Sequence, residues 1–295
     1  MLNEWVFERR VNEEAAQQFR HLEKELLSRP AKDGRIILSG PLIELIFPGW
    51  IPGQENVLFG APHDDDNHIG NALLTLAVSE FGGIPYYLVA TDGRYGCPSL
   101  DILETGQNAA KRKAENVAAS RILGVPEDRI IRLEYVDGSL PYYAGIKALN
   151  GAEGLQISLT KELRRTMATR VLMPTYSRYG LDHPDHRALN ETMRIAVAHA
   201  AGEEIWEEVG QPVQVKSLLE SVVYSRFDIP ADCALHAPQS AFERKLAAIS
   251  KFESQKQIAG LVKKVVEGGP IEHFLTIDLS GYNPKQYHQN HFGCE

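Results

Sequence analysis

Short apolar runs alternate with longer helical stretches over most of this chain. Strand-like runs are predicted at residues 57–59, 86–90, 130–133, 171–173, 218–224 and 274–279. Helices are predicted at 69–81, 107–123, 189–201 and 242–264. Strands that alternate with helices of this length are typical of βαβ units, in which helices cover both faces of a parallel sheet. The pattern therefore predicts an α/β fold with a mostly parallel, Rossmann-like sheet in three αβα layers.

The first 55 residues have a different pattern and are expected to form an N-terminal extension. Apolar residues recur at intervals of three or four over 3–28, which predicts an amphipathic helix that ends before Pro30. A segment rich in proline and glycine at 48–53 then marks a boundary. We therefore expect a helical extension at 1–55 and an α/β domain at 56–295, which together form one globular unit.

The charge and hydropathy of the chain limit its partners. It has 31 basic and 39 acidic side chains, and the net charge of −8 argues against a general nucleic-acid binder and against docking on an anionic membrane. No apolar run is long enough to span a bilayer, and the charged N-terminus does not resemble an export signal. The widely spaced Cys97, Cys233 and Cys294 fit a reducing cytoplasm. We expect a cytoplasmic protein that acts on a small molecule, and leave a homo-oligomer open.

Polar clusters follow several of the predicted strands. They lie at residues 61–67, 91–95, 137–138 and 174–187. Because the carboxyl ends of parallel strands meet at one edge of a sheet, and ligands bind outside that edge, these clusters are expected to come together. The sequence therefore predicts a single polar site at the carboxyl edge of the sheet.

The segment His63-Asp64-Asp65-Asp66 places three carboxylates beside an imidazole. Adjacent carboxylates repel one another unless a cation compensates their charge. A histidine and an aspartate three residues apart at a tight turn can both reach one metal ion. A calcium loop fits poorly, because Ile69 and Thr75 stand where glycine and glutamate are needed. Taken alone, the segment is explained more simply as a solvated acidic turn.

A second cluster is Asp182-His183-Pro184-Asp185-His186. Its two histidines lie three residues apart and suit one metal ligand and one acid–base group, although a surface turn explains this segment equally well. Together, the two clusters supply two imidazoles and a carboxylate, which is a known ligand set of catalytic zinc with an open position. Zinc in such a site lowers the pKa of its water ligand to about 7 and polarises a carbonyl.

The combined pattern resembles the PIG-L/LmbE-like family of metal-dependent N-acetylglucosaminyl deacetylases. The strand and turn at 57–66 are similar to the family's (A/P)HPDD(E) signature, and 183–186 to its H-P-D-H motif. Other similar segments are the R-x-x-E-x-x-A-A-x-x-x-L-G-V helix at 112–125, the D-G at 137–138, the K-x-x-A…S-Q helix at 245–255 and the E-x-F at 272–274. The resemblance extends from about 56 to 274, with the segments in the right order.

The resemblance implies a metal-dependent hydrolase that removes an N-acetyl group from an N-acetylglucosamine-type substrate and releases acetate and a free amino sugar. The metal it implies is usually zinc (Zn²⁺), with Fe²⁺ as the alternative. Asp65 would be the general base, taking a proton from the attacking water and delivering it to the departing amine. His183 would stabilise the oxyanion as a cation, held by Asp185. The implied metal ligands are His63, Asp66 and His186.

Two further residues are candidates for substrate binding. By the resemblance, Arg112 would bind sugar hydroxyls, or it would pair with Glu115 or another carboxylate. Asp137 follows a predicted strand at the active edge, although Asp-Gly is also a common turn dipeptide. We therefore include both residues in the predicted site, on the side of the substrate.

The sequence also departs from the family pattern. Asp64 stands where the family usually has proline, Asn67 where it often has glutamate, and Arg94 where glutamate often follows the D-G. These differences affect the predicted substrate more than the predicted reaction. One alternative is a hydrolase of another amide, such as a thiol-sugar conjugate. The other is a non-catalytic carbohydrate-binding relative, which Asp65 and His183 argue against because binding alone needs neither.

Overall fold

A single ten-stranded sheet runs through the molecule. The computed structural model describes residues 4–96, 105–177, 182–202, 207–223, 227–255 and 258–279. The strands are β1 (Val6–Val11), β2 (Leu27–Pro30), β3 (Ile36–Gly40), β4 (Asn56–Ala61), β5 (Ile84–Thr91), β6 (Ile130–Tyr135), β7 (Arg170–Pro174), β8 (Ser217–Ser221), β9 (Cys233–His236) and β10 (Ile271–Ile277). Neighbouring strands follow the order β2-β3-β1-β9-β10-β8-β7-β4-β5-β6.

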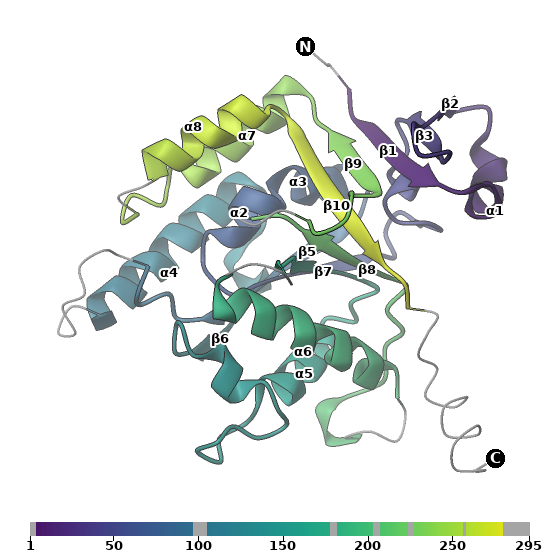
Figure 1. The fold of residues 1–295 in the computed structure, drawn as a ribbon. Coiled ribbons are helices and arrows are strands. Elements are labelled where there is room, and N and C mark those ends of the chain that lie inside the picture. Colours follow the sequence, from purple (N-terminus) through teal and green to yellow (C-terminus); the bar gives the residue numbers. More distant parts are fainter. Residues whose placement is uncertain are drawn as a thin grey trace, which may run out of the picture.

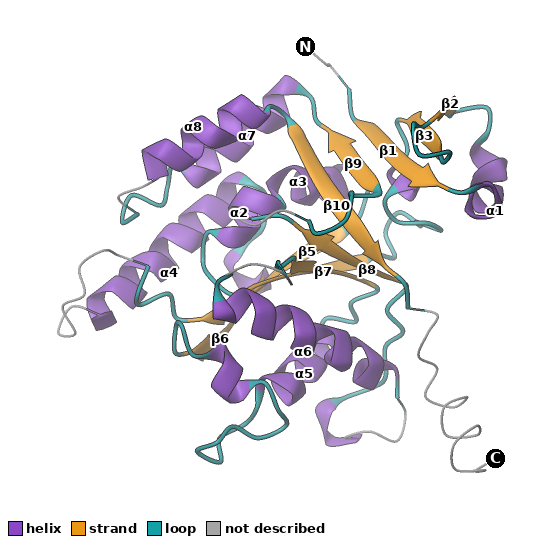
Figure 2. Cartoon of the chain, in the orientation of Figure 1, coloured by secondary structure: helices purple, strands orange, loops and turns teal. Residues whose placement is uncertain are grey.

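Helices pack on both faces of this sheet (Figures 1 and 2). They are α1 (Glu13–Ala16), α2 (Asp66–Gly70), α3 (Ala72–Glu80), α4 (Thr105–Ile122), α5 (Leu155–Arg165), α6 (Pro184–Ala201), α7 (Gln239–Ile249) and α8 (Ile258–Gly268). In Figure 1, α2, α3, α4, α7 and α8 lie on one side of the sheet, and α5 and α6 lie on the other. No helix in the described ranges has both the length and the hydropathy needed to cross a membrane.

The prediction of a mostly parallel sheet was wrong, because the sheet is mixed. The five strands β8-β7-β4-β5-β6 are parallel to one another and give four parallel pairs. The remaining five pairs, which join β2, β3, β1, β9, β10 and β8, are antiparallel. The α/β pattern that the sequence shows describes only the first group. The second group is built from strands near the two ends of the chain.

The prediction of a helical N-terminal extension was also wrong. Residues 6–11 form β1, and α1 is only four residues long. In β1, every second side chain is buried. One of these buried residues is Arg9, so the sequence does not show the regular alternation of apolar and polar residues that indicates a strand. The Arg9 guanidinium is held there because its Nη1 donates to the carbonyl oxygens of Leu45 and Ile46, at 3.2 and 3.3 Å. Since β1 pairs with β9, the extension and the domain share one sheet, and the boundary at residue 55 stays a prediction.

The helix predicted over 242–264 is interrupted and forms α7 and α8. The interruption contains Phe252, which is buried, and Ser254, whose backbone N–H and Oγ both donate to the Glu115 carboxylate on α4, at 2.8 and 2.6 Å. A backbone N–H that donates to a side chain in this way does not continue a helical ladder. These bonds hold the segment between α7 and α8 against α4.

Two apolar cores lie on the two faces of the sheet. The central strand β4 contributes to both, because Val57 and Phe59 belong to one core and Leu58 to the other. A strand that is buried on both faces has no polar alternation, which is why this run could be recognised as a parallel strand from the sequence. Its position in the sheet places the turn that follows Ala61 at the carboxyl edge.

A buried ion pair connects β10 to two helices. The Glu272 carboxylate accepts hydrogen bonds from the backbone N–H groups of Leu73 and Leu74, at 2.9 and 3.0 Å, in the first turn of α3. Lys245 on α7 donates its Nζ to the same carboxylate at 2.8 Å. A negative charge at a helix N-terminus satisfies N–H groups that have no partner in the helix. Glu272 therefore fixes α3 behind the site, and Lys245 balances its charge.

Lys245→Met is expected to destabilise the fold by about 3–5 kcal/mol, because it leaves the buried Glu272 carboxylate without its cation. The measurement is the free energy of unfolding in urea. Lys263→Met is the matched control, since Lys263 is 79 % exposed and faces Glu267 at 4.0 Å, and it should change stability by less than about 1 kcal/mol. Equal effects of the two substitutions would show that the buried pair contributes no more than a surface pair.

Candidate active site

The predicted site residues lie at the carboxyl ends of the parallel strands. His63, Asp65 and Asp66 belong to the turn between β4 and the start of α2, and Asp137 follows β6. The second cluster begins α6, where Pro184 occupies the first turn and His183 is the N-cap. Proline suits this position because a first-turn N–H has no partner in the helix. The carboxyl edge of the sheet therefore brings the two sequence clusters together.

Three candidate metal ligands face one another. The atom Asp66 Oδ2 lies 3.1 Å from His63 Nδ1 and 3.4 Å from His186 Nε2. Ligand atoms placed about 2.1 Å from a zinc ion at tetrahedral angles are about 3.4 Å apart. Asp66 Oδ1 is buried and has no hydrogen-bond partner among the described residues. This donor set and its spacing fit a divalent metal ion such as zinc.

The turn that carries His63 and Asp66 is fixed by its own hydrogen bonds. The Thr91 backbone N–H and Oγ at the end of β5 both donate to the Pro62 carbonyl oxygen, at 3.0 and 2.8 Å. The backbone N–H of His63 donates to Asp66 Oδ2 at 2.9 Å. These bonds set the direction in which the chain leaves β4. The two side chains are therefore placed by backbone geometry as well as by their mutual attraction.

The charges in this cluster are strongly coupled. Burial raises the pKa of Asp66, but the neighbouring His186 and His63 outweigh burial and lower it to about 2. Burial lowers the pKa of His63, but the Asp66 charge and the contacts with Asp137 and Asp185 raise it well above the usual histidine value. Burial is the main cause that lowers the pKa of His186. Asp66 thus stays ionised, and a metal ion would have to displace the proton that His63 holds.

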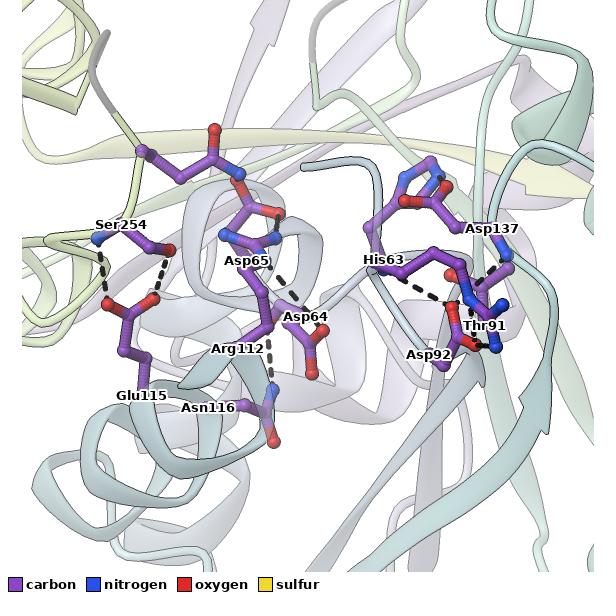
Figure 3. Close-up of polar contacts among 12 residues, drawn as sticks. His63, Asp64, Asp65, Thr91, Asp92, Arg112, Glu115, Asn116, Asp137 and Ser254 are labelled. Atoms are coloured by element: carbon purple, nitrogen blue, oxygen red, sulfur yellow. Dashed lines mark hydrogen bonds and ion pairs between the residues drawn. The ribbon is translucent and has the colours of Figure 1, made fainter. Parts of the chain in front are cut away.

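The other ring nitrogen of His63 faces two carboxylates. Its Nε2 lies 3.3 Å from Asp137 Oδ1 and 3.4 Å from Asp185 Oδ2. Figure 3 shows His63 beside Asp137. Carboxylates that accept the second N–H of a metal-ligating histidine fix its ring orientation and raise its basicity. Asp137 therefore lies against His63, and its predicted place on the substrate side stays a prediction.

The hydrogen bonds of the Asp185 carboxylate are made with backbone groups and not with His183. The carboxylate accepts hydrogen bonds from the backbone N–H groups of Gly138 and Leu140, at 2.7 and 2.9 Å, in addition to facing His63. The contact with His183 is made instead by the Asp185 backbone N–H, which donates to His183 Nδ1 at 3.3 Å. His183 is exposed, and its ring centroid lies 4.5 Å from that of His63. The backbone at the start of α6 therefore contacts this imidazole, and an Asp185 carboxylate oxygen lies within 4.8 Å of a His183 ring nitrogen, so the role predicted for Asp185 stays a prediction.

Asp65 is held by two side chains from other parts of the fold. Arg112 on α4 donates its Nη2 to Asp65 Oδ1 at 2.7 Å, and Gln255 donates its Nε2 to Asp65 Oδ2 at 3.2 Å. Arg112 is 1 % exposed and packs over the Phe252 ring, 5.3 Å from its centroid. Of the two roles proposed for Arg112, the structure favours pairing with a carboxylate, and that carboxylate is Asp65 rather than Glu115 (Figure 3).

Two contributors to this part of the site were missed in the sequence. Gln255 belongs to the motif at 245–255, and that membership was the available signal. The second is Arg132 on β6, an arginine within an otherwise apolar run, whose Nη1 donates to Asp64 Oδ1. Burial raises the pKa of Asp64, while Arg132 and Arg112 act in the opposite direction. Burial outweighs the two cations, so the pKa of Asp64 lies above its usual value.

Gly93 is needed where Asp64 approaches β5. Its φ is +64°, and a Cβ at this position would overlap Asp64 Oδ2. Gly93→Ala is expected to cost about 1 kcal/mol in backbone strain and about 1–3 kcal/mol more for the overlap. Gly34→Ala is the matched control, because Gly34 has a φ of +81° and no atom lies within 4 Å of the place that a Cβ would take. Urea unfolding of both variants checks this, and equal losses would contradict the overlap.

The model of the family described as PIG-L: GlcNAc-PI de-N-acetylase matches residues 58–197. This segment is similar to the PIG-L family. It runs from β4 into α6 and includes all three candidate metal ligands. None of the curated proteins compared with this chain matches it.

Solved structures share the fold of this chain. N,N'-diacetylchitobiose deacetylase from Pyrococcus horikoshii is 24 % identical with a TM-score of 0.62, covering 76 % of this chain and 84 % of its own. The conserved protein TT1542 from Thermus thermophilus is 23 % identical with a TM-score of 0.59, covering 77 % and 97 %. GalB, the 4-carboxy-2-hydroxymuconate hydratase from Pseudomonas putida KT2440, is 16 % identical with a TM-score of 0.61, covering 78 % and 99 %. Since a hydratase shares the fold with a deacetylase, the reaction must be argued from the site.

Proposed function

We propose that this chain is a zinc-dependent hydrolase that removes the N-acetyl group from an N-acetylglucosamine-type substrate and releases acetate and a free amino sugar. The observation that carries the proposal is the approach of His63 Nδ1 and His186 Nε2 to Asp66 Oδ2, directly beside the buried Asp65. The PIG-L family match over the same residues supports the choice of an amide substrate.

Hydrolysis of an amide makes three demands on a site. Because an amide is a poor electrophile and an amine is a poor leaving group, the site must provide a base for water, charge stabilisation at oxygen and a proton for nitrogen. When bound, zinc lowers the pKa of a water ligand to about 7 and polarises the carbonyl. In this proposal His63, Asp66 and His186 would hold the ion, and Asp137 and Asp185 would fix His63 through its other nitrogen.

The proton transfers are assigned to Asp65. It accepts a proton from the attacking water and passes it to the departing amine. The contacts with Arg112 at 2.7 Å and Gln255 at 3.2 Å set the orientation of its carboxylate for both steps. His183 is assigned to the oxyanion, because it is exposed at the N-cap of α6 and its ring lies against that of His63.

The test is a substrate panel with protein of known zinc content. The panel contains N-acetylglucosamine, N,N'-diacetylchitobiose and the acetamide of a thiol-sugar conjugate, and both acetate and free amine are quantified. We expect equal amounts of acetate and amine from the N-acetylglucosamine compounds. Release from the thiol-sugar amide alone would move the proposal to that class of amide. Sugar binding measured by calorimetry, with no release from any compound, would overturn it in favour of a carbohydrate-binding protein.

A further inference from the structure

Two adjacent carboxylates are buried beside the site, with two guanidinium groups around them. The side chain of Asp64 is 0 % exposed, and those of Arg112 and Arg132 are 1 % and 7 % exposed. Arg112 is close to both carboxylates, since its Nη2 lies 2.7 Å from Asp65 Oδ1 and its Nε lies 3.9 Å from Asp64 Oδ2. One buried cation is therefore shared unequally between two neighbouring anions.

The second guanidinium group, that of Arg132, pairs with the Asp64 carboxylate. Arg132 lies on β6, and its Nη1 donates to Asp64 Oδ1. Its Nε donates to Glu134 Oε1 at 3.0 Å, which fixes the direction of the guanidinium plane. The turn itself is held from α4, because Asn116 Nδ2 donates to the Asp64 carbonyl oxygen at 2.6 Å (Figure 3). Asp64 is therefore anchored from β6 by its side chain and from α4 by its backbone.

We propose that Arg132 is a positioning residue for the reaction: by binding Asp64, it keeps Arg112 on Asp65 and so fixes the carboxylate of the base. The inference rests on the proposed function, in which Asp65 transfers the protons. Without Arg132, the buried Asp64 charge would have Arg112 as its only nearby guanidinium among the described residues. Attraction between unit charges is strong in a buried site, so Arg112 would move from Asp65 toward Asp64.

The Asp64–Arg132 pair explains how this chain accommodates an aspartate where the PIG-L/LmbE-like family usually has proline. Asp64 and Asp65 carry two negative charges, and Arg112 and Arg132 carry two positive charges. Each carboxylate then has one close guanidinium partner. Removing both members of the Asp64–Arg132 pair should therefore preserve the Arg112–Asp65 contact, whereas removing Arg132 alone should weaken it.

Arg132→Gln is the first test, with kcat and KM measured on N,N'-diacetylchitobiose. We expect kcat to fall at least about tenfold, with KM changed by less than about twofold and the zinc content unchanged. The double variant Asp64→Asn/Arg132→Gln should regain most of that loss, because neither charge is left unpaired. Arg121→Gln is the matched control on the surface of α4, where Arg121 is 64 % exposed and pairs with Glu127. An unchanged kcat in Arg132→Gln, or a double variant no faster than the single one, would overturn the proposal.

A crystal structure of each variant separates this proposal from the proposed function. In Arg132→Gln, Arg112 should leave Asp65 Oδ1 and approach Asp64, and in the double variant it should return to Asp65. Arg112 remaining on Asp65 in both would overturn the inference whether or not the protein deacetylates sugars. If the wild-type protein were inactive on every amide, only the proposed function would be rejected, and the structures of the variants would still test the role of Arg132. If Arg132→Gln does not fold, Arg132→Lys replaces it. Lysine keeps a cation beside Asp64, so Arg112 should stay on Asp65 and kcat should remain close to the wild-type value, and a loss as large as about tenfold in that variant would overturn the proposal.

Discussion

Asp65→Asn is expected to lower kcat for deacetylation by about 10²–10⁴-fold while the bound zinc is retained. The substitution keeps the shape of the side chain and one oxygen that Arg112 can contact, but the amide cannot accept a proton from water. Asp65 is not among the three candidate ligands, so the metal should stay in place. The measurements are steady-state kinetics and zinc content by atomic absorption on the same preparation.

Asp128→Asn is the control for this experiment. It makes the same chemical change at an exposed position before β6, and both kcat and zinc content should remain at the wild-type level. A variant Asp65→Asn with kcat near that of the wild type would remove Asp65 from the role of base. Loss of zinc from Asp65→Asn would instead show that the side chain contributes to holding the metal.

His186→Ala is expected to weaken zinc binding by at least about 100-fold, because it removes one of three protein ligands, and even outer contacts of ligands are worth about 10–100-fold. Activity should fall with the zinc content. The affinity is measured by competition with a chelating dye after dialysis. Circular dichroism tests whether the buried side chain has been replaced without unfolding the protein.

The matched control is His21→Ala. The His21 side chain is 61 % exposed and lies 3.9 Å from Glu44, far along the chain from the site. This variant should bind zinc as tightly as the wild type. If His186→Ala also retained wild-type affinity, His186 would not be a ligand, and the group formed by His63, Asp137, His183 and Asp185 would become the better candidate for the metal.

The parallel half of the sheet could be predicted because its strands are recognisable from local sequence. Runs such as 57–59 and 171–173 are apolar on both faces and are followed by polar turns, as in buried parallel strands. The antiparallel half of the sheet could not be predicted, because its strands lack a clear pattern of apolar and polar residues. β1 buries Arg9 among its inward residues, and β9 is only four residues long. The helix α5 was not predicted either, although Leu155, Leu159 and Leu163 recur at four-residue spacing.

The site, like the sheet, could be predicted only in part from the sequence. His63, Asp66 and His186 come from two compact sequence clusters, and the structure brings them within reach of one ion. The partners of Asp65 could not be inferred from local pattern, because Arg112 and Gln255 lie 47 and 190 residues away from it along the chain. The direction of the Asp185 carboxylate depends on backbone N–H groups in the turn after β6, which no side-chain motif encodes. Long-range packing determines these contacts, while the motifs determine only the residue types.

The decisive measurement is acetate release from N,N'-diacetylchitobiose by three preparations of the protein. These are chelator-treated wild type, wild type reloaded with one equivalent of zinc, and Asp65→Asn reloaded in the same way. If the protein is a zinc-dependent deacetylase with Asp65 as its base, only the reloaded wild type should release acetate rapidly. Full activity in the chelator-treated protein, or in reloaded Asp65→Asn, would contradict it.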